Sequence, residues 1–133
     1  MRKFVAAIFL AAFVACGGDS STNPSESIAG TYTLRTVNGS ALPFTFYSDA
    51  TTKVEVTDDA ITINEGGTFT ETGHTRTTTS GRVTTESIVD AGTYTRNGTA
   101  ITFKGSDATP TSGSISGSSL TLADQGISAV YSK

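Results

Sequence analysis

His74 is the single histidine of the chain, and Glu71 precedes it by three residues. A histidine beside a carboxylate can act as a general base or bind a metal. On a β-strand, however, residues three positions apart lie on opposite faces, so these two side chains do not converge if the segment is a strand. We therefore expect His74 to be an exposed strand residue, and we predict no catalytic residues and no enzyme.

The acidic residues Asp49, Asp58 and Asp59 could supply oxygen ligands to a Ca²⁺ ion. Their spacing does not match that of an EF-hand loop. A zinc site needs three or four His, Cys or acidic ligands, and the chain has one His and one Cys. We interpret the three aspartates as ordinary turn residues, and we predict neither a metal nor another cofactor.

Cys16 is the sole cysteine, so no disulfide can form within the chain. It follows a basic start at Arg2 and Lys3, an apolar run over residues 4–14, and Ala15. A positive start, a short apolar run and a small residue before the cleavage point are typical of a secretory signal peptide. The apolar run is too short to cross a bilayer comfortably. The pattern therefore predicts export.

The sequence Phe13-Val14-Ala15-Cys16 resembles the lipobox of bacterial lipoproteins, in which a small residue precedes a cysteine that is linked to diacylglycerol. The family prefers an aliphatic residue where this chain has Phe13. The resemblance implies that residues 1–15 are a lipoprotein signal peptide and that acyl chains on Cys16 hold the protein on a membrane. Gly17 after the cysteine favours, by analogy, the outer membrane facing the periplasm. The alternative is an ordinary signal peptide cleaved near Ala15.

Residues 16–27 comprise the lipidated cysteine and a segment without apolar residues, which predicts a flexible tether. Residues 28–133 are left as one folded domain. Once Arg2 and Lys3 are removed with the signal, seven Lys and Arg remain against twelve Asp and Glu, a net charge of −5. The remaining basic residues are scattered, which argues against a nucleic-acid partner.

Within the domain, short runs of alternating apolar residues are separated by turn dipeptides such as Asn38-Gly39, Ser80-Gly81 and Asn97-Gly98. Asn-Gly is a strong hairpin signal because both residues tolerate positive φ. No stretch has the spacing of an amphipathic helix. We predict an all-β fold, an antiparallel up-and-down barrel of about eight to ten strands, with a β-sandwich as the alternative. The terminal segments 30–37 and 126–132 are expected to pair and close the barrel.

Two places in the pattern leave the strand boundaries open. Val54 and Val56 lie at even positions but Ile61 and Ile63 at odd ones, which predicts a tight turn or a β-bulge near Asp58-Asp59. Residues 83–89 and 92–96 are expected to form two strands, interrupted at residues 90–92.

A family resemblance spans nearly all of the predicted domain. The segments that carry it are Gly30-Thr31-Tyr32-Thr33-Leu34, Val37-Asn38-Gly39, Leu42-Pro43, Gly92-Thr93-Tyr94 and Val130-Tyr131. Together they resemble the lipocalin-like domain of small bacterial lipoproteins, which has a calycin-type barrel. The lipocalin Gly-X-Trp is absent, and Tyr32 stands where the Trp is expected. The resemblance implies a fold and no particular ligand.

We expect a non-enzymatic, lipid-anchored barrel of the cell envelope that binds a small hydrophobic ligand. Tyr32, Phe44, Phe46 and Phe103 are the candidate lining residues. The alternative is a module for protein–protein interaction or a structural module, in which aromatic side chains fill the barrel. The size of the interior separates the two, since ligand pockets usually exceed roughly 300 Å³.

Overall fold

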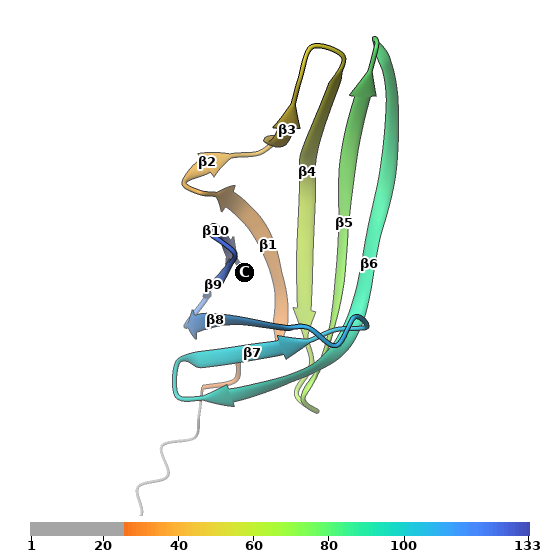
Figure 1. The fold of residues 1–133 in the computed structure, drawn as a ribbon. Coiled ribbons are helices and arrows are strands. Elements are labelled where there is room, and N and C mark those ends of the chain that lie inside the picture. Colours follow the sequence, from red (N-terminus) through yellow and green to blue (C-terminus); the bar gives the residue numbers. More distant parts are fainter. Residues whose placement is uncertain (1–25) are drawn as a thin grey trace, which may run out of the picture.

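A computed structural model of the chain describes residues 26–133. The predicted signal peptide and Cys16 lie outside the described residues. The described part folds into ten β-strands (Figure 1), and no helix in it is long and apolar enough to cross a bilayer. The strands are β1 (Gly30–Val37), β2 (Ser40–Ala41), β3 (Phe44–Ser48), β4 (Thr52–Ile63), β5 (Thr68–Thr79), β6 (Arg82–Asn97), β7 (Ala100–Lys104), β8 (Pro110–Ser116), β9 (Ser119–Asp124) and β10 (Ile127–Ser132).

Eight of these strands, β1 and β4 to β10, form a closed antiparallel barrel. The predicted pairing of the terminal segments is confirmed, because β1 lies against β10 with Leu34 opposite Tyr131. On its other side β1 pairs with β4, where Tyr32 lies opposite Ile61. This second pairing completes the ring, so the fold is the predicted up-and-down barrel and not the alternative sandwich. The short strands β2 and β3 extend β1 and β4 beyond the ring.

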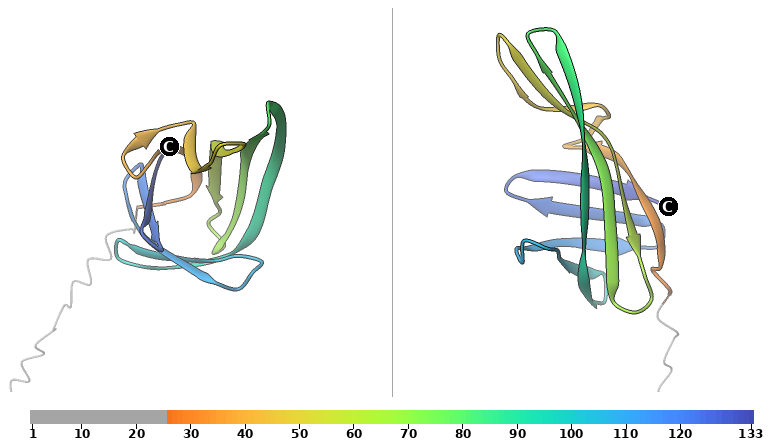
Figure 2. Two further views of the ribbon diagram at one scale, coloured as in Figure 1. Left: turned by 45° about the horizontal axis from the view of Figure 1, so that its top comes forward. Right: turned by 90° about the vertical axis from the view of Figure 1, so that its right-hand side faces the viewer.

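The two ends of the barrel differ (Figures 1 and 2). We call one end the closed end: there the chain enters the barrel beside the β6–β7 turn, where Arg96 donates a hydrogen bond to the Glu26 carbonyl. The β5–β6 turn lies toward the other end, which we call the open end. Tyr32, Ile115 and Leu120 are fully shielded from solvent, and the Tyr32 hydroxyl donates a hydrogen bond to the Ile28 carbonyl at 2.8 Å. Full burial of such side chains contributes about 1.5–3 kcal/mol each. The remaining core residues are Ile28, Leu34, Val37, Val56, Ile61, Ile63, Phe69, Ile101, Phe103 and Tyr131.

The parity change in β4 is a β-bulge and not a turn, since the strand runs unbroken and its register with β5 shifts between Val56 and Asp58. The bulge absorbs one residue, so both Val56 and Asp59 face the interior. The interpretation of Asp58 and Asp59 as turn residues is therefore wrong. Asp49 does lie in a turn, where its carboxylate accepts hydrogen bonds from the N–H groups of Thr51 and Thr52.

The expected interruption at residues 90–92 is also wrong, because β6 is continuous. Gly92 lets the strand continue there: a Cβ at this position would overlap the Lys104 carbonyl oxygen. β5 pairs along its whole length with residues 82–93 of β6, whereas β7 pairs with β6 only over residues 93–97. Parts of β3 to β6 therefore project beyond the ring as a sheet that we call the arm, residues 44–56 and 75–89 (Figure 2).

Candidate functional site

Two cavities lie inside the open half of the barrel and meet at Glu71. The upper cavity, of about 230 Å³, opens toward the arm. The side cavity, of about 140 Å³, lies under the β7–β8 loop. The upper cavity is lined by Leu34, Val37, Phe46, Val56, Asp59, Glu71, Thr75, Ile88, Ile127, Ala129 and Tyr131. The side cavity is lined by Ile61, Phe69, Glu71, Asp90, Phe103, Gly105, Asp107, Thr109, Thr111 and Leu122.

A pair of carboxyl groups forms the polar floor of the upper cavity. Asp59 follows the bulge in β4 and is 7% exposed. Its Oδ2 accepts a hydrogen bond of 2.7 Å from the Tyr131 hydroxyl, and its Oδ1 accepts one of 2.9 Å from the N–H of Ala60. Glu71 lies on the neighbouring strand β5, opposite Ile61, and its carboxyl group is hydrogen-bonded to that of Asp59. The pair therefore links β4, β5 and β10 across the interior.

Burial sets the protonation of this pair. Desolvation, followed by repulsion from Asp59, raises the pKa of Glu71 to about 8. Burial also raises the pKa of Asp59, but the hydrogen bond from Tyr131 opposes that shift. The pair therefore resists losing its last proton, and of the two groups Glu71 has the pKa that burial raises to about 8. Burial likewise raises the pKa of the Tyr131 hydroxyl, which stays a donor.

Gly73 gives the Asp59 carboxylate its space. The two residues are opposite each other in the β4–β5 pairing. A Cβ on residue 73 would lie 2.7 Å from Asp59 Oδ1 and 2.9 Å from the Asp58 carbonyl oxygen. A side chain here would displace the carboxylate, so this glycine is required by the site and not by a turn.

The rim of the upper cavity is apolar and open to solvent. Phe46 is 49% exposed, Ile88 40% and Ile127 38%. Phe46 packs edge-on against Phe44, with ring centroids 5.1 Å apart. Outside this rim, Phe46, Ile127 and Ala129 continue into a shallow hollow of about 340 Å³. The site thus has an apolar mouth and walls that lead to a buried polar floor.

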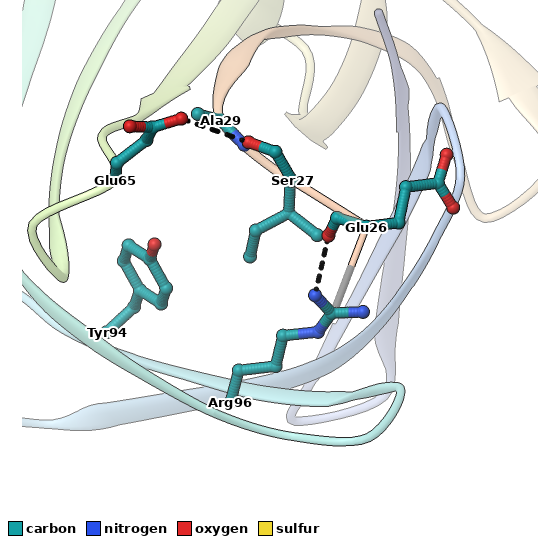
Figure 3. Close-up of a pocket in the computed structure, with 7 residues that line it drawn as sticks. Glu26, Ser27, Ala29, Glu65, Tyr94 and Arg96 are labelled. Carbon is teal, nitrogen blue, oxygen red and sulfur yellow. Dashed lines mark hydrogen bonds between the residues drawn. The ribbon is translucent and has the colours of Figure 1, made fainter. Parts of the chain in front are cut away.

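A further hollow, of about 310 Å³, lies at the closed end (Figure 3). Arg96 Nη1 donates a hydrogen bond of 3.1 Å to the Glu26 carbonyl, and Ser27 Oγ donates one of 3.4 Å to Glu65. Glu26, Ser27 and Glu65 are exposed, and the hollow is wide open to solvent. These contacts fasten the incoming chain to the barrel, and we do not take this hollow as the functional site.

The charged residues of the outer face form one pair and one group of three. His74 Nδ1 lies 2.7 Å from Asp58 Oδ1, on the opposite side of the sheet from Glu71. Glu55 lies between Lys53 Nζ at 2.6 Å and Arg76 Nη2 at 2.8 Å, and these hydrogen bonds lower the pKa of its carboxyl group. In residues 26–133 no three His, Cys, Asp or Glu side chains are placed to hold a metal ion.

The four candidate lining residues do not gather in one place. Phe46 lies at the mouth of the upper cavity, and Phe103 lines the side cavity and packs against Phe69 with centroids 4.9 Å apart. Tyr32 is buried in the core, and Phe44 packs on the core behind Phe46. Asp59 and Glu71 were not among the predicted lining residues. The alternation of side chains nevertheless indicates that both face the interior, because Glu71 lies two residues from the inward-facing Phe69 and Asp59 two residues from the inward-facing Ile61.

Comparison with protein-family models, with curated protein sequences and with solved structures found no match to this chain.

Proposed function

We propose that the protein is a non-enzymatic, lipid-anchored barrel of the cell envelope that holds a small, largely apolar molecule in the upper cavity. The observation that supports this most is the combination of an exposed apolar rim with the buried Asp59 and the partly buried Glu71 beneath it. Ligand pockets are commonly lined by apolar side chains, with a few polar groups that fix the ligand's orientation.

The size of the site limits its ligand. The upper cavity alone, at about 230 Å³, is smaller than most ligand pockets. The adjoining hollow adds space outside the rim and shares Phe46, Ile127 and Ala129 with it. A small molecule that inserts one end between Phe46 and Ile127 and leaves the other in the hollow fits both spaces.

The polar end of such a ligand would meet Glu71. We assign the carboxyl pair to binding and not to catalysis, because the oxygens of Asp59 are already engaged by Tyr131 and Ala60. Glu71, which joins the upper and side cavities, is the group that a ligand can reach from either side.

The anchor that we propose at Cys16 would place the mouth away from the membrane. Residue 26 meets the barrel at the closed end, opposite the arm (Figure 1). Nine residues lie between Cys16 and Glu26, so ten Cα–Cα steps join them, a span of at most about 36 Å. Cys16→Ser is expected to abolish fatty-acid labelling and to shift the protein out of the membrane fraction; unchanged labelling and fractionation would refute the anchor.

The ligand proposal can be tested by native mass spectrometry of the full chain, extracted gently from its own host. We expect an additional noncovalent mass on the wild-type protein. Ala129→Leu fills part of the upper cavity and should abolish that mass. Ala123→Leu is the matched control, because Ala123 is exposed on the next strand. A wild-type protein without added mass, or an unaltered mass in Ala129→Leu, would count against a ligand in this cavity.

A further inference from the structure

More than half of strand β6 has no neighbouring strand on one side. Residues 82–92 pair with β5, but β7 pairs only with residues 93–97, and in residues 26–133 no other strand lies along the free edge. Val83 and Val89 on this stretch are 57% and 73% exposed. Natural sheets usually protect such edges with Lys, Pro or a bulge. The segment from Val83 to Val89 contains no Lys or Pro, and its pairing with β5 runs without a register shift.

The hairpin geometry identifies the backbone groups that point outward. β5 and β6 are joined by Ser80 and Gly81, both with positive φ, and Thr79 lies opposite Arg82. In such a two-residue hairpin the flanking pair is hydrogen-bonded, so the even residues of β6 bond to β5. The N–H and C=O groups of the odd residues Val83, Thr85, Ser87 and Val89 therefore face the free edge.

We propose that this edge pairs with the same edge of a second copy of the chain, antiparallel about a two-fold axis at Glu86. In that register Val83 lies opposite Val89 of the second copy, and Thr85 lies opposite Ser87, which places outward-facing backbone groups against each other. Arg82 lies opposite Asp90, whose carboxylate accepts hydrogen bonds from the N–H groups of Ala91 and Ser106, so residues of opposite charge occupy both ends of the pairing. A two-fold contact of this kind is self-complementary and closes at the dimer.

The same register places the two Glu86 side chains opposite each other on the axis. Like charges directly opposite on neighbouring strands are unfavourable. The interface is also a single strand pair, so we expect a weak dimer that forms reversibly with concentration. Glu86→Gln removes the repulsion and should tighten the dimer about threefold. This inference does not depend on the proposed ligand, because the pairing uses the outward-facing backbone groups of β6, whereas Ile88 on the same stretch lines the upper cavity with its side chain.

The test is sedimentation velocity over a range of concentrations, with the protein expressed from residue 17 onward, a chain that contains no cysteine. We expect a monomer–dimer equilibrium for the wild type. Ser87→Pro removes an N–H that faces the free edge and leaves the β5–β6 bonds intact, so it should give a monomer with an unchanged far-ultraviolet spectrum. Val89→Lys is the second variant and should weaken the dimer at least about tenfold. A wild type that stays monomeric, or a dimer that both variants leave unchanged, would overturn the proposal.

Cysteine cross-linking tests the register itself. In a non-hydrogen-bonded antiparallel pair, opposite Cα atoms are about 4.5 Å apart, within the range of a disulfide. Glu86→Cys should therefore form a covalent dimer under mild oxidation. Thr84→Cys is the matched control on the same face: the two copies of residue 84 would lie four residues apart along the strand, about 13 Å, and should not cross-link. Equal cross-linking of both variants, or cross-linking of Thr84→Cys alone, would overturn the proposed pairing.

Discussion

The closed half and the open half of the barrel share the same strands but differ in what fills them. Around Tyr32, Ile115 and Leu120 the closed half is packed with fully buried side chains. The open half instead holds the upper cavity and the hydrogen-bonded Asp59 and Glu71.

The difference can be followed along a single strand. From the closed end toward the open end, the inner face of β5 carries Phe69, Glu71, Gly73 and Thr75. A large apolar side chain is thus followed by a carboxyl group, a glycine and a small polar residue, while β5 stays paired with β6 without a shift and with β4 across its bulge. The packed closed half can therefore stabilise the fold, while the open half tolerates a cavity and a buried charge, both of which are destabilising.

The largest effect is expected from opening the ring on which both halves depend. Deletion of residues 126–133 removes β10, leaves β1 and β9 with new edges, and exposes the core around Leu34 and Leu120. The lost burial should exceed the 5–15 kcal/mol by which a domain of this size is stable. We expect an unfolded or aggregated protein by circular dichroism and size-exclusion chromatography. A truncated monomer with a cooperative transition near that of the intact domain would contradict closure by the terminal strands.

Matched truncations should separate the two halves. Ile115→Ala removes a fully buried side chain from the closed half and should cost about 2–5 kcal/mol in the free energy of unfolding. Ile127→Ala, at the 38% exposed rim of the upper cavity, should cost less than about 1 kcal/mol. Urea denaturation measures both. Equal losses would mean that the open half is packed as tightly as the closed half.

The carboxyl pair should make stability depend on pH. The pKa of Glu71 is about 8 in the folded protein and 4.5 in its ordinary state. Between these values the folded protein binds more protons than the unfolded chain, so the free energy of unfolding falls as pH rises from 5 to 8. The low pKa of Asp49, about 2, acts only below this window. Glu71→Gln should flatten the decline and stabilise the protein at pH 8, as measured by denaturation at each pH. An unchanged slope would show that Glu71 is ionised in the folded state.

The smallest effect is expected on the outer face. His74 and Asp58 form a close pair, but their side chains are 40% and 56% exposed, and exposed pairs contribute little. His74→Ala should change the free energy of unfolding by less than about 0.5 kcal/mol. A loss of several kcal/mol would show that this pair has a structural role comparable to that of the interior.

The alternation of apolar residues and the Asn-Gly turns were sufficient to predict the barrel and its closure, because inward-facing residues such as Tyr32 and Tyr131 must share one core. The breaks in the pattern were harder to interpret. Sequence alone did not distinguish a bulge from a turn at Asp58-Asp59, because either one shifts the inward-facing residues from even to odd positions. It also ended a strand at residues 90–92, where Gly92 instead allows β6 to approach Lys104 closely.

The site was predicted less well for a physical reason. Aromatic residues were chosen as ligand contacts, but large aromatics are also what fills a core, and Tyr32 does so. The carboxyl pair depends on the diagonal contact between Asp59 and Glu71, which requires the register of β4 against β5. The alternation along each strand predicts that Asp59 and Glu71 face the interior. Only the register of β4 against β5 shows that the two side chains are neighbours.

The open half of the barrel contains an accessible cavity, and the closed half does not. Methyl NMR under xenon pressure tests this directly, because xenon enters apolar cavities that are otherwise empty. We predict shifts for the methyl groups of Leu34, Val37, Val56, Ile88 and Ile127, which line the upper cavity, and none for Ile115 and Leu120. Ala129→Leu should reduce the shifts, whereas Ala123→Leu should not. Shifts centred on Ile115 and Leu120, or the absence of any response around the upper cavity, would contradict this account of the molecule.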